Sequence, residues 1–190
     1  MFISIEGCIG SGKTTTARIV AERLSYLALP EETAHHPFLA DFYSNPSLYA
    51  LETELGFVLL HYHRLKMVHD RTAVVSDFSP GKDLVFAKMN LDGADLALFK
   101  YVYKDLSERL VRPQIAVFLD LPIDVLMERI HRRGRPYEQG VPTSYVERLR
   151  DMYLTHFKEL ADVVELVKVT ESDSREEVAE KALQSIKSHL

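Results

Sequence analysis

The chain has 190 residues, of which 46% are hydrophobic and 27% are charged, and its formal net charge is −5. This length suits a single domain with a sizeable core. The negative charge argues against a general nucleic-acid binder, because such proteins gain affinity by neutralising phosphates. The one cysteine, Cys8, rules out an intramolecular disulfide framework and suits a reducing compartment. No apolar run approaches the roughly 20 residues that cross a bilayer, so we expect a cytoplasmic protein that binds neither membrane nor nucleic acid.

Strand-like and helix-like segments alternate along the sequence. Buried-strand patterns occur at 1–6, 26–29, 73–76, 114–119 and 163–169. Helical patterns occur at 13–24, 47–69, 94–110, 124–133, from the end of a loop at 134–142 through to 160, and at 175–190. This alternation predicts an α/β fold with a five-stranded parallel sheet, helices on both of its faces, and residues 1–190 as one domain.

Two of the predicted helices carry apolar seams, in which hydrophobic residues recur at steps of three and four. The seam of 47–69 comprises Leu48, Leu51, Leu55, Val58, Tyr62 and Leu65. The seam of 94–110 comprises Leu96, Phe99, Tyr103, Leu106 and Leu110. Such seams either pack inside the molecule or pair two subunits. We expect a homodimer through these two helices, with intramolecular packing as the alternative.

A glycine-rich turn lies between the first strand and the first helix. Residues 7–14, GCIGSGKT, match the phosphate-binding pattern G-x-x-x-x-G-K-[ST] in full. Glycines let backbone N–H groups surround an anion, and the following helix directs its positive end at that anion. Lys13 can reach the β- and γ-phosphate oxygens, and the Thr14 hydroxyl can ligate Mg²⁺. We expect ATP to contact Gly7, Cys8, Ile9, Gly10, Ser11, Gly12, Lys13, Thr14 and Thr15.

A second basic segment is rich in arginine. Residues 129–135, RIHRRGR, hold four arginines beside a glycine. Arginines on a loop can fold over a transferring phosphoryl group and neutralise its oxygens, which would make this segment a lid at about 129–142. A solvated basic helix end is the alternative, since cations also suit the negative end of a helix. The phosphate-binding turn in the same chain favours the lid, with Lys13, Arg129, Arg133 and Arg135 as catalytic residues.

The sequence resembles the deoxynucleoside kinases from the phosphate-binding turn to about residue 153. Besides that turn and the RGR of the lid, the resemblance rests on 36–43 (HPFLADFY), on 77–87 and on EQG at 138–140. It implies a P-loop NTPase-type enzyme that transfers the γ-phosphate of ATP to the 5′-hydroxyl of a deoxyribonucleoside. It also implies that Glu31 is the general base, with Glu32 as the alternative, and that Tyr43 and Glu138 bind the sugar 3′-hydroxyl. A core aromatic is the other interpretation of Tyr43.

The chain departs from the family's pattern after the third predicted strand. The family has an acid followed by Arg-Ser, and this sequence has Asp77-Phe78-Ser79. By resemblance, Asp77 lies near the Mg²⁺ that accompanies ATP, together with Thr14. Phe78 cannot supply the charge of the family's arginine. Either another arginine replaces it, such as Arg64 or Arg129, or the enzyme works without one.

A second departure concerns the nucleobase. The family reads the base with a glutamine on the long helix, where this chain has Glu54, and the resemblance also brings Phe57, His61 and Asp83 to the base. An ionised carboxylate only accepts hydrogen bonds, which suits the two adjacent donors of guanine, whereas a protonated one also permits adenine. We expect a purine deoxynucleoside, with deoxyguanosine ahead, although Glu54 on a solvated face is the alternative. The resemblance places the ATP adenine near 170–174.

Two other functions stay open at this point. A thymidylate kinase or another nucleotide kinase would share the P-loop and the lid. A regulatory module that binds nucleotides without phosphoryl transfer would explain Phe78, although such a binder needs no arginine-rich lid. A panel of nucleosides assayed for ADP release distinguishes these classes.

Overall fold

The computed structural model describes residues 1–69, 71–156, 158 and 160–190. Within these residues, five parallel strands form one sheet in the order β2-β3-β1-β4-β5. The strands are β1 (Phe2–Gly7), β2 (Leu27–Leu29), β3 (Val74–Ser76), β4 (Ile115–Asp120) and β5 (Val163–Lys168). The five strands expected from the sequence are all present, so the predicted parallel sheet is confirmed, with β1 at its centre.

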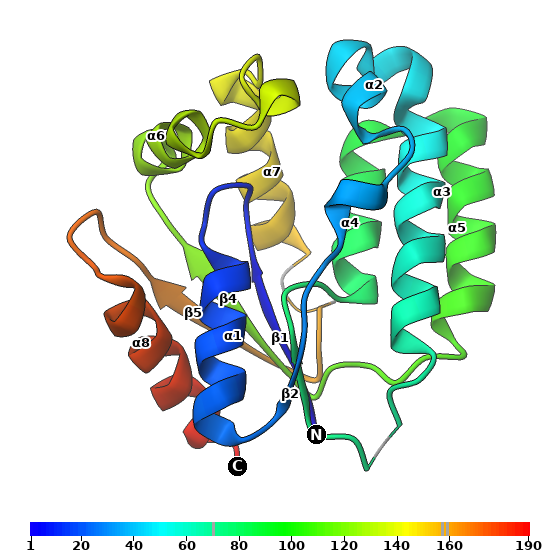
Figure 1. Cartoon of the computed structure of the whole chain (residues 1–190). Coiled ribbons are helices and arrows are strands. Elements are labelled where there is room, and N and C mark those ends of the chain that lie inside the picture. Colours follow the sequence, from blue (N-terminus) through cyan, green and yellow to red (C-terminus); the bar gives the residue numbers. More distant parts are fainter. Residues whose placement is uncertain (70, 157, 159) are drawn as a thin grey trace.

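Helices cover both faces of this sheet (Figure 1). In the view shown, α1 (Lys13–Leu24) and α8 (Arg175–Lys187) pack together in front of the sheet, and α7 (Thr143–Thr155) lies behind it, in contact with α6 (Ile123–Arg133). A bundle of α3 (Pro46–Leu65), α4 (Pro80–Asn90) and α5 (Gly93–Ser107) stands beside the sheet, with α2 (Leu39–Ser44) against α3. The 3-10 helices η1 (Thr33–His35) and η2 (Pro136–Glu138) lie in connecting segments. No helix in the described part of the chain is long and apolar enough to span a bilayer.

The central strands are buried because helices cover them on both sides. Phe2, Ile3 and Ile5 of β1 are 0% exposed, and β4 is buried from Ile115 to Leu119. Strands of this kind read as nearly continuous apolar runs, which is the pattern that the sequence displays. Glu6 is an exception within β1, and burial raises the pKa of its carboxyl group.

The two apolar seams are only partly used inside the molecule. Val58, Leu65 and Phe99 are buried, whereas Leu48 is 60% exposed. Other seam positions are half-buried, and the outer surface of α3 and α5 also exposes Leu59, Leu98 and Tyr101. Intramolecular packing therefore accounts for one side of each helix and leaves apolar side chains on the other.

The sequence did not predict α4, which occupies Pro80–Asn90 between the third strand and the second seamed helix. The helix packs against α3, α5 and α7, so it is buried on more than one side. Its buried residues include the polar Lys82 and Asp83 as well as Val85, Ala87 and Met89. A helix buried in this way has no single apolar stripe, and Pro80 and Gly81 at its start resemble a turn.

Candidate active site

The carboxyl ends of β1, β2 and β3 bring together three segments that are distant in sequence. Ser76 of β3 lies level with Leu29 of β2 and with Ser4 of β1, and the strands are parallel. The chain continues from these ends into Asp77, Glu31 and the P-loop. Ligands of open parallel sheets bind at such an edge. A cavity of about 440 Å³ lies here, and its walls include Ile9, Lys13, Thr14, Glu31, Tyr43, Glu54, Phe57, Asp77, Lys82, Asp83, Phe86, Arg133, Arg135, Glu138 and Tyr145.

The P-loop (residues 7–14) has the backbone conformation that its glycines permit. Gly10 and Gly12 have φ angles of +84° and +90°, and a Cβ atom at Gly10 would lie 2.9 Å from the carbonyl oxygen of Leu126. These positions therefore favour glycine. The loop leads directly into α1 at Lys13, so the positive end of that helix faces the loop. Cys8 is buried beneath the loop, and burial raises the pKa of its thiol to about 12, which leaves it protonated and unreactive.

A second cavity, of about 640 Å³, lies on the other side of the P-loop. Its lining includes Gly10, Ser11, Gly12, Thr15, Arg129, Arg132, Arg133, Glu171, Asp173, Ser174 and Arg175. Arg133 lines both cavities. The P-loop and Arg133 thus lie between this basic cavity and the first cavity, which Glu31 lines.

Asp77 connects the P-loop to Glu31. Its Oδ2 accepts a hydrogen bond from the Thr14 hydroxyl, and its Oδ1 accepts a 2.6 Å bond from the backbone N–H of Glu31. Mg²⁺ is usually held by one or two carboxylates together with substrate phosphates and water. A hydroxyl oxygen and a carboxylate in contact beside a phosphate-binding loop fit that donor set. Thr14 and Asp77 are therefore suited to hold the ion that accompanies a nucleotide.

Glu31 lies at the centre of a buried network of charges. Its Oε1 accepts hydrogen bonds from the ammonium group of Lys82 and, at 2.9 Å, from Nε2 of His61. Nδ1 of His61 in turn bonds to Oδ1 of Asp83 at 2.7 Å. Burial alone would raise the pKa of Glu31, but Lys82 and then His61 outweigh it and lower that pKa. Burial alone would likewise lower the pKa of His61, but Asp83 and Glu31 raise it to about 9, so the imidazole is charged at neutral pH.

The first cavity is also lined by another buried acid, Glu54 of α3. It is 2% exposed, and its Oε1 accepts a 2.7 Å hydrogen bond from the side-chain amide of Asn90 on α4. Burial raises the pKa of Glu54 to about 8, so the neutral form predominates at pH 7. The rings of Phe57 and Phe86 line the same cavity and form an apolar wall beside this acid. The arrangement suits a flat ring with polar groups at its edge.

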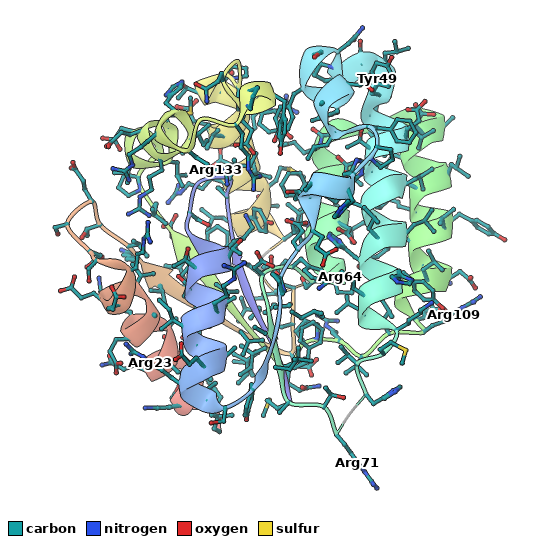
Figure 2. All side chains as sticks on the ribbon, in the orientation of Figure 1. Arg23, Tyr49, Arg64, Arg71, Arg109 and Arg133 are labelled. Atoms are coloured by element: carbon teal, nitrogen blue, oxygen red, sulfur yellow. The ribbon has the colours of Figure 1, made fainter. Side chains whose placement is uncertain are left out.

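The arginine-rich segment that the sequence predicts to be a lid (129–142) begins within a helix. Arg129 and Arg133 lie on α6, which ends at Gly134 with a φ of +70°, and Arg135 follows it. The helix predicted at 124–133 is therefore present, and it carries Arg129 and Arg133 close to its C-terminal end, where cations suit the negative helix end. Figure 2 shows Arg133 above the P-loop.

Glu138 of η2 joins the predicted lid to the wall of the first cavity. It is 3% exposed, and it accepts hydrogen bonds from Nε of Arg133 at 3.1 Å and from Nη1 of Arg135 at 3.2 Å. Tyr43 of α2 lines the cavity beside it and stacks on Tyr137, with 5.5 Å between the ring centroids. The structure thus places Tyr43 and Glu138 in the wall of the same cavity.

The deoxynucleoside kinase family model matches residues 3–190. The chain belongs to the deoxynucleoside kinase family. It is therefore an ATP-dependent phosphotransferase with a deoxynucleoside as the acceptor, as the sequence predicted.

Known relatives match the kinase over most of its length. It is 31% identical to the deoxyguanosine kinase of Bacillus subtilis (strain 168) over 188 residues, which cover 95% of this chain and 91% of the relative. It is 27% identical to the deoxyadenosine kinase of Dictyostelium discoideum over 177 residues, or 90% of this chain and 72% of the relative. A solved deoxyadenosine kinase from M. mycoides shares its fold, with a TM-score of 0.84 at 20% identity and full coverage of both chains.

One predicted base contact lies elsewhere in the kinase. His61 does not line the first cavity but a third one, of about 140 Å³, because its two ring nitrogens are bonded to Glu31 and Asp83. The alternative general base, Glu32, is exposed and pairs with Arg64. Figure 2 shows Arg64 on the α3 side of the molecule, and Arg129 lines the second cavity. Neither arginine pairs with Glu31, so neither replaces the arginine that the family has at the position of Phe78.

From the sequence we did not anticipate Lys82 and Tyr145, which line the first cavity, or Asn90, which bonds to Glu54. Lys82 and Asn90 belong to the helix α4 that the sequence did not predict. A sign of Lys82 was nevertheless available, because Ser79 followed by Pro80 is typical of a helix start and a lysine in a first turn opposes the macrodipole. Nothing in the sequence indicated Asn90 or Tyr145, because their roles depend on how α4 and α7 pack.

Proposed function

We propose that the kinase transfers the γ-phosphate of ATP, held with Mg²⁺, to the 5′-hydroxyl of a purine deoxyribonucleoside. One observation carries the proposal, namely that Glu31, the Thr14–Asp77 pair and Lys13 line a single cavity beside the P-loop. In this proposal residues 1–190 form one catalytic domain with a lid at about 129–142.

ATP occupies the second cavity in this proposal. Its adenine lies against 170–174, three of whose residues line that cavity, and its phosphates lie in the P-loop under Arg129 and Arg133. The Thr14 hydroxyl and the Asp77 carboxylate hold Mg²⁺, which neutralises charge on the β- and γ-phosphates. Lys13 reaches the same oxygens and keeps the nucleotide in place.

The deoxyribonucleoside occupies the first cavity, with its 5′-oxygen towards Glu31. That oxygen attacks the γ-phosphorus while the bond to the β–γ bridging oxygen breaks. Glu31 accepts the hydroxyl proton, and Arg133 and Arg135 stabilise the equatorial oxygens. The products are ADP and the 5′-monophosphate. Tyr43 and Glu138 bind the 3′-hydroxyl, which fixes the sugar.

Glu54 selects a purine in this proposal. Its neutral carboxyl group can donate to N1 of adenine and accept from the 6-amino group, whereas its ionised form can accept from N1–H and the 2-amino group of guanine. The Asn90 amide fixes the carboxyl group without using all its lone pairs. Relatives described as deoxyguanosine and deoxyadenosine kinases support a purine acceptor. Phe57 packs on the base.

The exposed apolar surface of α3 and α5 supports a homodimer through these helices. Leu59 is 56% exposed, Leu98 is 48% exposed and Tyr101 is 78% exposed. Large side chains of this kind favour burial by a second subunit. The buried thiol of the single cysteine is compatible with the cytoplasm, where we place the kinase.

A substrate panel tests the proposed function. The kinase is assayed with ATP and Mg²⁺ against four deoxynucleosides, their ribonucleoside counterparts and thymidylate, and the 5′-monophosphate or diphosphate products are separated by chromatography. We expect deoxyguanosine and deoxyadenosine to give the highest kcat/KM. Equal turnover of deoxycytidine or thymidine would contradict the purine assignment, and faster turnover of thymidylate would favour a nucleotide kinase. Replacement of Lys13 by Ala is the control for phosphoryl transfer at this P-loop.

A further inference from the structure

The residue after Asp77 is apolar and fully buried. Phe78 is 0% exposed, and its ring stacks on the imidazole of His61 with 4.3 Å between the centroids and 21° between the planes. The position therefore supports His61 from one side and contributes no charge to the active site. A cation for Glu31 must come from another residue, because a buried carboxylate without a partner is costly.

Lys82 provides that cation from the first turn of α4. Its side chain is 9% exposed, and its ammonium group is paired with Oε1 of Glu31. The ammonium also lies 5.8 Å from the ring centroid of Phe57 and 5.7 Å from that of Phe86, within the range of a cation–π contact. Ser79 fixes the start of the helix by accepting a 3.3 Å hydrogen bond from the backbone N–H of Lys82. The lysine is thus held at both its backbone and its charged end.

The other charges around this pair come from several elements. Lys13 of α1, His61 of α3, Asp77 after β3, and Asp83 of α4 surround Glu31 and Lys82, and Glu6 lies beneath them at the end of β1. Burial opposes a charge on Lys82, but Glu31 and then the two aspartates outweigh it and raise its pKa. Lys82 therefore remains charged, even though a lysine in the first turn opposes the helix macrodipole.

We propose that Lys82 is the positioning residue for Glu31, so that the cation missing at position 78 is supplied from α4 instead. The inference rests on the proposed role of Glu31 as the proton acceptor. Lys82 and His61 both bond to Oε1 of Glu31. Together they fix the orientation of the carboxylate and therefore the direction of its other oxygen, Oε2. A relative with an arginine after the acid would place its cation on the strand end, whereas this kinase places it one helical turn later.

This role predicts a loss in turnover rather than in substrate binding. Without Lys82, Glu31 keeps only His61 and loses the contact that fixes its carboxylate. General-base assistance contributes roughly 10²–10⁴-fold to rate, so Lys82→Met should lower kcat by roughly 100-fold. KM for ATP and for the deoxynucleoside should change by less than about threefold, because the P-loop and Glu54 remain intact. Lys82→Arg should keep the charge and retain most of the activity.

The experiment compares steady-state kinetics of Lys82→Met, Lys82→Gln, Lys82→Arg, Glu31→Gln and the double variant Glu31→Gln/Lys82→Met. Lys88→Met is the matched control, since Lys88 lies on the same helix and bonds to His156, away from Glu31. Thermal unfolding of each variant measures its stability separately. If Lys82 acts through Glu31, the double variant is no slower than Glu31→Gln alone.

Several results would overturn the inference. They are unchanged kcat in Lys82→Met and Lys82→Gln, an equal loss in Lys88→Met, or losses that multiply in the double variant. A lower melting temperature with unchanged kcat would make the ion pair structural only. If the unmodified kinase phosphorylates no nucleoside, the proposed function itself fails. In contrast, a failure confined to Lys82 leaves that activity intact, so the two failures are distinguishable.

Discussion

The protonation of Glu54 should make the choice between deoxyadenosine and deoxyguanosine depend on pH. The neutral carboxyl group matches adenine and the ionised form matches guanine. Because burial raises its pKa to about 8, the neutral form predominates at neutral pH and the ionised form above pH 8. Rising pH should therefore favour deoxyguanosine, and falling pH should favour deoxyadenosine.

The size of the effect follows from this pKa. With a value of about 8, the ratio of ionised to neutral Glu54 rises from about 1:30 at pH 6.5 to about 3:1 at pH 8.5, a change of about 100-fold. If each form accepted only one base, the ratio of the two kcat/KM values would change by the same factor. Glu54→Gln carries a permanent donor and acceptor, so it should mimic the neutral form, favour deoxyadenosine and show no such change.

Direct competition measures this ratio. The kinase is given equal concentrations of both deoxynucleosides with ATP, and the two monophosphates are quantified by chromatography between pH 6.5 and 8.5. Effects of pH on ATP binding or on Lys13 cancel in the ratio, and Glu54→Gln corrects for the nearby Asp83, Lys82 and His61. A ratio constant within about threefold, or one that changes equally in Glu54→Gln, would refute the reasoning.

Three further predictions test other parts of the site. Glu31→Gln should lower kcat by roughly 10²–10⁴-fold in the coupled assay, and activity within a few fold of the unmodified kinase would remove Glu31 from the mechanism. Glu138→Gln should lower kcat/KM for deoxyguanosine roughly 10- to 100-fold, because a hydrogen bond to a charged group is lost. The same substitution should matter little for 2′,3′-dideoxyguanosine, which has no 3′-hydroxyl. Equal losses for both nucleosides would contradict the 3′-hydroxyl contact. Leu59→Glu with Leu98→Glu should convert a sedimenting dimer into a monomer, and a monomeric unmodified kinase at micromolar concentration would contradict the dimer.

Much of the fold could be predicted because its features are local in the sequence. The P-loop consists of consecutive residues with a strand before it and a helix after it. The strands are short apolar runs bounded by turn residues, and a central strand such as β4 is apolar on both faces. The roles predicted for Glu31, Tyr43 and Glu138 came only from the family resemblance.

The remaining parts depend on packing between distant segments. The cation beside Glu31 comes from Lys82, on a helix that lacks a one-sided apolar stripe because it is buried on several sides. The two ring nitrogens of His61 bond to the carboxylates of Glu31 and Asp83. Only the arrangement of α3, α4 and the end of β2 brings both carboxylates within reach. The neutral state of Glu54 likewise follows from burial, which a sequence pattern does not reveal.

Identification of the product tests the central claim most directly. The kinase is incubated with ATP, Mg²⁺ and deoxyguanosine, the phosphorylated products are followed by ³¹P NMR, and 2′,5′-dideoxyguanosine serves as an acceptor without the 5′-hydroxyl. The account predicts deoxyguanosine 5′-monophosphate and ADP in equal amounts, and no transfer to the analogue. Phosphate on the 3′-hydroxyl, or release of inorganic phosphate without a nucleotide product, would contradict it.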